Sequence, residues 1–384
     1  MSAPLDGVLV IDLSRALAGP HAGMMLGDLG ARVIKVESPE GDESRGWGPP
    51  FVRGSDGNEH ATYFLSCNRN KESIACDLKS GDGREVLTAL VERADVLIEN
   101  FRPGVLDRLG FSVARLHEIN PGLVILSITG FGHDGPEGSR PGYDQIAQGE
   151  GGLMSVTGPS PHEPTRCGLP VGDILAGVYG AYGVAAALVE RTRTGRGQVV
   201  RTSLLAAVVG AHAYHGTRFT VAGDLPRTTG NFHPSICPYG LYRVADGFVQ
   251  IAVANDALWG RFAPAFGLDR PQWASNRERV ADKDAVNAAV DAAFSEATAA
   301  EVLDVLAGLG IPAGKVRDLE EVYAWEQTRS QGLLIDVEHA ALGQITVPGP
   351  PLRFDSGGRT GHAPPPLLDQ HGDSIRAWLR RRDQ

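Results

Sequence analysis

One carboxylate in the chain lies in surroundings that could make it reactive. Asp173 stands in the stretch CGLPVGDILAGVYGAYG, between glycines and apolar residues and with no basic residue inside the segment. The residues that follow predict a helix from 174 to about 193, which places the aspartate at its N-terminus. There the side chain could cap the free N–H groups of the first turn. It could instead act as a nucleophile without a partner base, because the helix dipole keeps a carboxylate ionised.

The glycines of the predicted helix favour the nucleophile. Gly177, Gly180 and Gly183 recur every three residues, and each glycine costs a helix about 1 kcal/mol relative to alanine. A strip of glycines lets another backbone or a thin ligand approach closely. We therefore expect a close neighbour along this face of the helix, with the carboxylate at the mouth of the strip.

The elements before this helix alternate between strands and helices. A buried strand at 8–14 is followed by a glycine-bearing turn and a helix, and then by a second strand at 32–37. The alternation continues to a strand at 123–132. This pattern predicts an α/β fold with a largely parallel sheet covered on both faces. Ligands of such sheets bind beyond the carboxyl ends of the strands.

A second, smaller unit follows a loop rich in glycine, proline and asparagine. The stretch LYRVADGFVQIAVAN predicts a hairpin that turns at Asp246–Gly247, and helical segments come after it. We expect a Rossmann-like large domain, a linker, a small α+β domain, and a second linker with a C-terminal return to the large domain. These parts span residues 1–205, 206–226, 227–316 and 317–384.

The composition limits the classes of partner and the cellular compartment that can be expected. The 384 residues carry a net charge of −10, which argues against a nucleic-acid partner, and the apolar runs look too short to span a membrane. The four cysteines form no CxxC pair, which favours reduced thiols over a disulfide scaffold or a zinc site. The N-terminal residues show no secretory leader. We therefore expect a soluble, cytoplasmic protein that holds anionic ligands with local basic clusters.

Several long motifs occur in one order along the chain. They are ALAGPHAGMMLGDLGARVIKVE, CNRNKESIACDLKS, ADVLIENFRPGVLDRLG, GYDQIAQGEGGLMSVTG, PVGDILAG, RTGRGQV, GIPAGKVRDLEEV and PPPLLDQHG. Together they cover nearly the whole chain and resemble the family III CoA-transferases, the CaiB/BaiF group, to which methylacyl-CoA racemases are related. The resemblance implies that Asp173 is catalytic and attacks an acyl-CoA thioester. It also implies an interlocked homodimer of two open rings, and long linkers of this kind are unusual in a compact monomer.

The resemblance also implies where coenzyme A binds. The positions lie at the ends of predicted strands or on the helices that follow, where ligands of open α/β sheets bind. They are Ala16, Ala18, Cys76, Leu78, Lys79, Asn100, Phe101 and Arg108. The first strand, its turn and Glu37 also mimic an NAD-binding unit, but ALAGPHAG lacks the GxGxxG pattern. We expect coenzyme A as a co-substrate, and no metal, ATP or NAD.

Two departures from the family patterns argue against racemisation. The racemases carry a histidine where this chain has Tyr143 and a glutamate where it has Asn255, and neither residue here is a base near neutral pH. We therefore expect a CoA-transferase in which Tyr143 bonds around the acyl group. An acyl-CoA racemase or epimerase and a non-catalytic CoA-binding protein are the alternatives. Asp144, beside Tyr143, could support the site or pair locally.

The acceptor acid is indicated by fewer residues. Formyl-CoA transferases have a glutamine where Leu17 stands, and a tetraglycine loop with no counterpart here, which argues against oxalate. The stretches SRGWGPPF and GNFHPSICPYGLY are more similar to relatives that move CoA between succinate and other dicarboxylates. A distal carboxylate needs an arginine or a histidine, and Arg45 and His233 are the candidates. We expect a succinyl-CoA-like donor and a dicarboxylate that contacts Leu17, Tyr143, Arg45 and His233.

Overall fold

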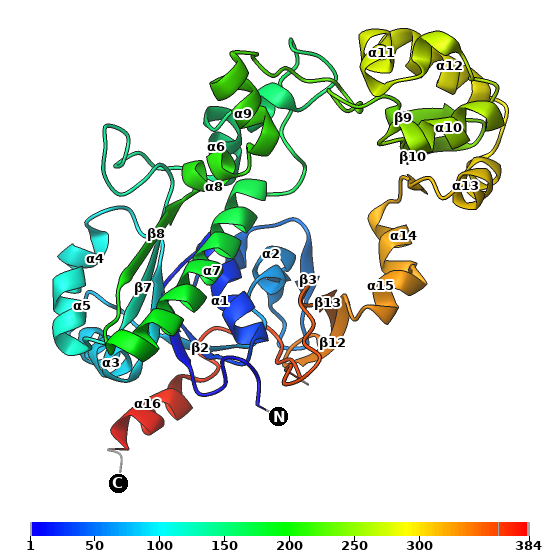
Figure 1. The fold of residues 1–384 in the computed structure, drawn as a ribbon. Helices are drawn as coiled ribbons and strands as arrows, with labels where there is room; N and C mark the ends of the chain where they lie inside the picture. The colour runs from blue at the N-terminus through cyan, green and yellow to red at the C-terminus, as the bar shows by residue number, and fades with distance from the viewer. Residues whose placement is uncertain (1, 360, 382–384) are drawn as a thin grey trace. The chain divides into compact units, whose positions relative to one another are not determined.

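The computed structural model describes residues 2–359 and 361–381, which form two compact units. Unit 1 comprises Met1–Leu153, Arg166–Ala222 and Glu326–Gln384, and unit 2 comprises Met154–Thr165 and Gly223–Trp325. The predicted linker 206–226 is mostly helical, because α8 (Leu204–Gly210) and α9 (Ala213–Ala222) occupy it and belong to unit 1. Figure 1 labels the elements along the chain.

Unit 1 is built on a six-stranded sheet with the order β5-β2-β1-β6-β7-β8. All neighbouring strands in it are parallel, as the alternating pattern predicted. The strand order reverses between β1 and β6, and ligands of open α/β sheets bind at such a reversal. The strands are β1 (Leu9–Asp12), β2 (Arg32–Glu37), β5 (Lys71–Ala75), β6 (Val96–Glu99), β7 (Val124–Thr129) and β8 (Val199–Ser203).

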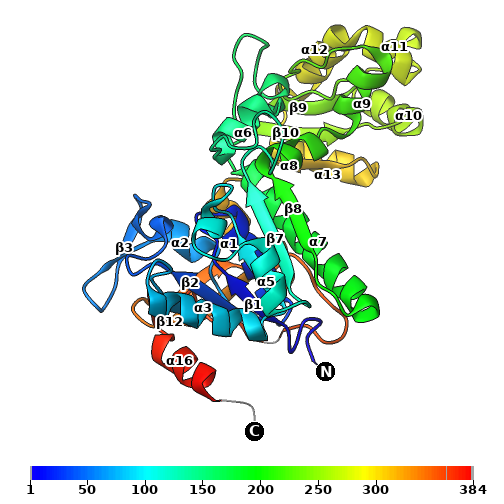
Figure 2. The same ribbon diagram turned by 90° about the vertical axis from the view of Figure 1, so that its left-hand side faces the viewer.

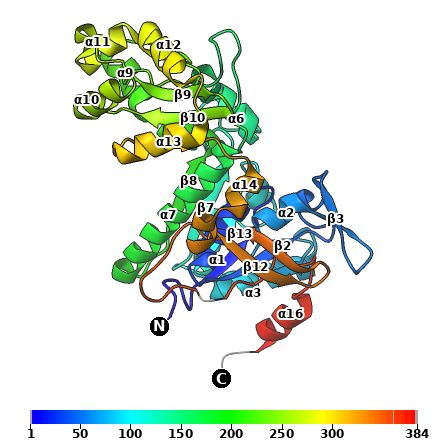
Figure 3. The ribbon, with the colours of Figure 1, turned by 90° about the vertical axis from the view of Figure 1, so that its right-hand side faces the viewer.

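Helices cover both faces of this sheet (Figures 2 and 3). Successive strand residues point to opposite faces, so Val10 packs with one set of helices and Ile11 with the other. The first set comprises α1 (Ala18–Asp28), α7 (Val171–Thr194) and α8. The second comprises α3 (Gly81–Arg93), α5 (Val113–Ile119) and the C-terminal α16 (Gly372–Arg380).

Helix α7 contains Asp173 and the three glycines Gly177, Gly180 and Gly183. Among the described residues it is the one helix long and apolar enough, by length and composition, to cross a membrane. The expectation that every apolar run is too short for this was therefore wrong for α7. Its apolar face packs on the sheet core, where Ala176, Val184 and Ala187 are buried.

Shorter elements complete unit 1. The C-terminal part belongs to unit 1 and contains a two-stranded antiparallel sheet and α16. The elements are η1 (Glu43–Gly46), β3 (Phe51–Arg53), β4 (Glu59–Ala61), α2 (Thr62–Ser66), α4 (Val105–Arg108), α6 (Asp144–Glu150), α15 (Glu326–Ser330), β12 (Leu334–His339) and β13 (Gly343–Pro348).

Unit 2 is an α+β unit with its own core. Its antiparallel sheet has the order β11-β10-β9, and β9 and β10 form the predicted hairpin. Trp259, Phe262 and Phe294 fill the core between this sheet and the helices. The elements are β9 (Tyr239–Val244), β10 (Gly247–Ala252), α10 (Asp256–Ala265), η3 (Pro271–Trp273), α11 (Asn276–Ala281), α12 (Lys283–Phe294), α13 (Ala299–Gly308), β11 (Ala313–Lys315) and α14 (Leu319–Ala324).

Candidate active site

A cavity of about 730 Å³ opens in unit 1 where the strand order of the sheet reverses. Its volume lies in the range of small-molecule sites. The turns that follow β1, β2, β5, β6 and β7 line it, together with the start of α7. The cavity therefore lies at the carboxyl ends of the parallel strands, where the fold class predicts a ligand.

Asp173 lines this cavity from the first turn of α7. In the described residues its carboxylate makes no hydrogen bond and no ion pair, and it caps no N–H group. The cap comes from a neighbouring helix, because Oδ1 of Asp144 accepts from the N–H of Gly172 at 2.7 Å and from that of Asp173 at 3.4 Å. The structural role considered for Asp173 therefore belongs to Asp144, and the Asp173 carboxylate is free for chemistry.

The protonation of Asp173 differs from the expectation. Burial, followed by the negative charge of Asp144, raises the pKa of Asp173 from 3.8 to about 7. The prediction that the helix dipole keeps it fully ionised was wrong, because a dipole contributes only about 0.3–1 kcal/mol at an exposed site, whereas burial removes a carboxylate from water. The ionised form is consequently more basic than an ordinary aspartate.

A buried amide holds the segment that leads into α7. Gln148 is fully buried, and its Nε2 donates to Oδ2 of Asp144 at 2.7 Å and to the carbonyl oxygen of Leu169 at 3.2 Å. Its Oε1 accepts from the N–H of Cys167 at 2.8 Å. Of the two roles left open for Asp144, support of the site is the one that the geometry favours.

The glycine strip of α7 has close neighbours, as predicted, but they are parts of the protein. A Cβ at Gly177 would lie 2.7 Å from the carbonyl oxygen of Ala18 in α1. A Cβ at Gly180 or Gly183 would lie 2.8 Å or 2.6 Å from a side chain of the sheet. The strip therefore seats α7 on the sheet, and Gly177 brings the start of α1 within one helical turn of Asp173.

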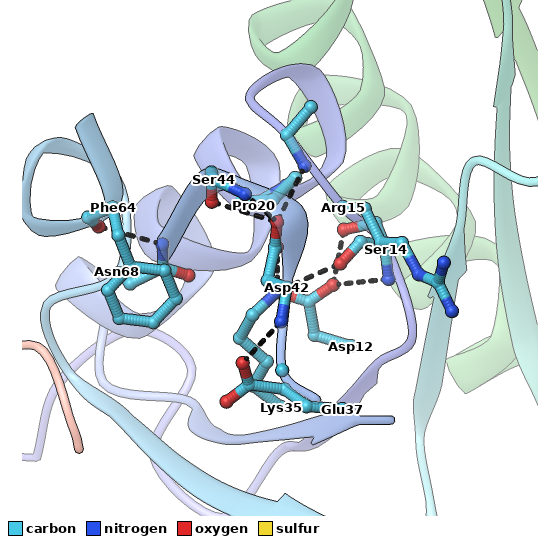
Figure 4. Close-up of polar contacts among 12 residues, drawn as sticks. Asp12, Ser14, Arg15, Pro20, Lys35, Glu37, Asp42, Ser44, Phe64 and Asn68 are labelled. Atoms are coloured by element: carbon cyan, nitrogen blue, oxygen red, sulfur yellow. Dashed lines mark hydrogen bonds and ion pairs between the residues drawn. The ribbon is translucent and has the colours of Figure 1, made fainter. Parts of the chain in front are cut away.

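A buried polar network shapes the turn between β1 and α1 (Figure 4). Lys35 donates to the carbonyl oxygen of Ser14 and pairs with Asp42, both at 2.8 Å. Asp42 also accepts from the N–H of Ala16 at 3.3 Å, and Ala16 has a left-handed φ of 65° that a residue with a Cβ seldom adopts. Asn100 accepts from the N–H of Arg15 and donates to its carbonyl oxygen, both at 2.8 Å. The turn is thus fixed before any ligand binds.

Three cations stand on the rim of the cavity. Arg15, Lys79 and Arg102 line it and are exposed, and none of them forms an ion pair within residues 2–359 and 361–381. Arg140 also lines the cavity but pairs with Glu150 at 2.7 Å. Guanidinium and ammonium groups free of protein carboxylates suit phosphate oxygens. Sequence reasoning found Lys79 only, although Arg15 and Arg102 directly neighbour two predicted positions.

Trp47, Tyr63 and Tyr143 form an aromatic cluster in the wall of the cavity that Asp173 also lines. The ring of Trp47 meets that of Tyr63 edge to face at 4.8 Å and that of Tyr143 at 6.3 Å, measured between ring centroids. Burial and the charge of Asp173 raise the pKa of Tyr63, so its phenol stays neutral and can donate a hydrogen bond. Leu17 packs against Tyr63 on the same wall. Sequence reasoning missed Trp47 and Tyr63, because only the fold brings them to Asp173.

Most of the sequence-predicted residues gather at this one cavity. Arg108 is an exception, because it is exposed on α4 and does not line it. Within the described ranges, no group of three or more His, Cys, Asp or Glu side chains could hold a metal ion. The predicted residues that line the cavity are Ala16, Leu17, Ala18, Cys76, Leu78, Lys79, Asn100, Phe101, Tyr143 and Asp173.

The two candidates for the distal carboxylate are not among the residues that line this cavity. Arg45 does not line the cavity, because its guanidinium pairs with the buried Glu37 at 2.7 Å and lies 3.7 Å from the ring centroid of Phe64. The geometry therefore gives Arg45 a structural role and not the substrate contact expected of it. His233 belongs to unit 2, where its ring stacks on Tyr239 with centroids 5.1 Å apart.

Comparison with known proteins gives consistent matches. Residues 5–372 of the chain match the family described as CoA-transferase family III. It is 37% identical to a succinyl-CoA:glutarate CoA-transferase of Mus musculus, over 99% of this chain and 87% of that one. It is also 37% identical to an acetyl-CoA:oxalate CoA-transferase of Acetobacter aceti, over 97% and 95%. The crystal structure of a CaiB/BaiF family protein from Brucella suis is similar, with a TM-score of 0.88, 39% identity and coverage of 99% and 100%.

Proposed function

The chain belongs to CoA-transferase family III, and on this premise we propose that it moves CoA from a succinyl-CoA-like donor to a dicarboxylate through covalent intermediates on Asp173. The observation that carries the proposal is that the Asp173 carboxylate lines the 730 Å³ cavity and caps no N–H group of α7. The similarity to a succinyl-CoA:glutarate CoA-transferase supports the choice of substrates.

The reaction exchanges acyl–oxygen and acyl–sulfur bonds. A carboxylate oxygen of Asp173 attacks the thioester carbonyl carbon, the carbon–sulfur bond breaks, and a mixed anhydride and CoA thiolate result. The thiolate then attacks Cγ of Asp173, the bond from Cγ to the anhydride oxygen breaks, and the first acid leaves as a carboxylate. An aspartyl-CoA thioester remains. The acceptor carboxylate runs these steps in reverse and restores Asp173, so the sequence balances without a net proton or electron.

The surroundings of Asp173 suit this chemistry. Each attack creates an oxyanion, which preorganised N–H groups stabilise best. Leu17 and Ala18, at the start of α1, line the cavity. The first N–H groups of a helix have no intrahelical partner, so theirs are our candidates for this role. The aromatic wall of Trp47 and Tyr63 excludes water, which would hydrolyse the anhydride.

The rim of the cavity suits coenzyme A. Its phosphates would bind Arg15, Lys79 and Arg102, which line the cavity and form no ion pair in the part of the chain that the structure describes. Its apolar parts would lie along Leu78 and Phe101, which line the same cavity. Arg108 remains a candidate on the resemblance alone.

The acyl group would lie against the aromatic wall, with Tyr143 and Tyr63 as hydrogen-bond donors. His233 remains a candidate for the distal carboxylate of the acid. We also propose a cytoplasmic homodimer, which the family resemblance favours.

The test is CoA exchange. The protein is incubated with succinyl-CoA and a panel of mono- and dicarboxylic acids, and new CoA thioesters are identified by mass, with D173A as the control. We expect a dicarboxylyl-CoA product that D173A does not form. Absence of exchange across the panel would contradict the proposal, and solvent deuterium entering an acyl-CoA without an acceptor would identify a racemase instead.

A further inference from the structure

We propose that Asp144 is a positioning residue for CoA transfer, which caps α7 in place of Asp173 and whose charge favours the acylated states of Asp173 over the free carboxylate. The inference rests on the proposed function of Asp173 as the nucleophile. It adds a role for a side chain that does not line the cavity and touches no substrate.

The geometry explains why Asp173 stays free. The N-cap side chain ordinarily accepts hydrogen bonds from the N–H groups of the first turn, but the N-cap of α7 is Pro170, which makes no such bond. At the start of α7 those donors are occupied, because Oδ1 of Asp144 accepts from Gly172 at 2.7 Å and from Asp173 at 3.4 Å. Gly172 makes this possible, since a Cβ there would lie 3.1 Å from the same oxygen.

The position of Asp144 is itself fixed. Its second oxygen accepts from the fully buried Gln148 at 2.7 Å, and Gln148 also binds the backbone of Cys167 and Leu169. One amide thus holds both the capping carboxylate and the chain that enters α7. The α6–α7 clamp, Asp144 with Gln148, determines where the Asp173 carboxylate lies.

The charge of Asp144 acts on the reaction as well as on the position. Titratable groups on the neighbouring elements include Asp144 on α6, whose charge acts on Asp173, Tyr63 on α2, and His21 on α1, which lies beside Gly177. Tyr63 is neutral, and burial together with Arg69 and Lys71 lowers the pKa of His21 to about 4, so His21 is neutral too. Burial raises the pKa of Asp173 most, and the charge of Asp144 raises it further.

The repulsion between the two carboxylates exists only while Asp173 is ionised. In the anhydride and in the aspartyl-CoA thioester Asp173 carries no charge, so acylation relieves the repulsion. Removal of the Asp144 charge should therefore make the free carboxylate more acidic and the covalent adducts less favourable. A purely structural residue would change neither property.

The experiment compares D144N, D144E and the control E118Q with the wild type. D144N keeps an oxygen that can cap Gly172 and removes the charge, but its amide NH2 replaces the oxygen that accepts from Gln148, so the position of the pH profile, and not kcat alone, reports the charge. E118Q removes one exposed charge on α5. The specificity constant kcat/KM is measured from about pH 5 to about pH 9. The fraction of protein that carries covalent CoA is measured by intact-protein mass spectrometry after incubation with succinyl-CoA and no acceptor acid. Far-UV circular dichroism confirms that each variant is folded, and D144S replaces D144N if the latter is not.

We expect kcat/KM of the wild type to rise with pH around pH 7, and that of D144N to rise about one pH unit lower. D144N should also hold a smaller fraction of covalent CoA, while E118Q matches the wild type. D144E keeps the charge but displaces the capping oxygen. Its kcat should therefore fall about tenfold, while the pH at which kcat/KM rises should change little. If folded D144N matches the wild type in both profile and adduct, the inference is wrong. If the wild type itself transfers no CoA, the proposed function fails instead.

Discussion

At the scale of single residues, the reactivity of Asp173 follows from what its neighbours do. Asp144 takes the capping role, burial and Asp144 raise the pKa of Asp173 to about 7, and the carboxylate has no bonding partner among the described residues. A buried carboxylate without a bonding partner lowers the stability of the fold, although it can be more reactive. Substitutions at single positions can therefore test both the stability and the activity.

The variant D173N should lose CoA transfer and gain stability. Its kcat should fall about a thousandfold or more, because the amide cannot form the anhydride. The folded pKa of Asp173 is raised, so the carboxylate destabilises the protein progressively as the pH rises from about 4 to about 7 and fully above that. In urea unfolding, D173N should therefore exceed the wild type in stability at about pH 8 and approach it at about pH 5. An equal difference at both pH values would contradict the raised pKa.

The variant R102Q should weaken the binding of acyl-CoA without slowing the chemistry. Phosphates far from the thioester are bound equally in the ground and transition states, so KM should rise about tenfold with kcat nearly unchanged. R115Q is a suitable control, because Arg115 is exposed on α5 and pairs with Glu118. A steady-state comparison in which R102Q and R115Q behave alike would remove Arg102 from the phosphate site.

At the scale of elements, the packing of α1 on α7 sets the distance between the proposed oxyanion donors and the proposed nucleophile. Gly177 permits that packing, because its missing Cβ leaves room for the backbone of Ala18. The network of Lys35, Asp42 and Asn100 fixes the turn that leads into α1. Both features serve to position Leu17 and Ala18.

The variant G177A should be less stable and less active. A Cβ at this position would lie 2.7 Å from the Ala18 carbonyl oxygen, and such overpacking costs about 1–3 kcal/mol. This exceeds the gain of about 1 kcal/mol in helix propensity. The matched control is G260A in α10, where nothing lies within 4 Å of the added Cβ and stability should rise. Thermal unfolding of both variants checks this, and a stabilised G177A would show that α1 can shift away.

The sequence predicted those features that depend on local pattern. Alternating strands and helices gave the parallel sheet, and the family motifs placed ten of the site residues at one cavity. Features that depend on tertiary contacts were missed or wrong. Trp47 and Tyr63 reach Asp173 only through the fold, the pKa of Asp173 depends on burial, and Arg45 is occupied because Glu37 is buried and needs a cation.

At the scale of the whole molecule, charge and exposed apolar surface both bear on function. The net charge of −10 opposes an anionic substrate at long range, so the rim cations must act locally. In unit 1, α7 exposes Tyr182 at 74% and Val189 at 63%, and Leu352 and Phe354 are exposed as well. Large exposed apolar side chains of this kind favour the proposed self-association.

Light scattering tests the proposed homodimer. The mass in solution should be twice the 40.7 kDa of one chain, and dilution across the assay range should not change it. Replacing Tyr182 by aspartate should lower the mass, because a charge would be buried without a partner. A mass equal to one chain for the wild type would contradict the proposal.

The most direct measurement is the identification of the covalent adduct on Asp173. The protein is incubated with succinyl-CoA in the absence of an acceptor, quenched in acid and digested, and the peptide that contains residues 171–182 is analysed by mass spectrometry. We predict a mass increase equal to CoA less water on Asp173, which hydroxylamine converts to a hydroxamate and which D173N lacks. An unmodified Asp173, with CoA or the acyl group attached at another residue, would contradict the account.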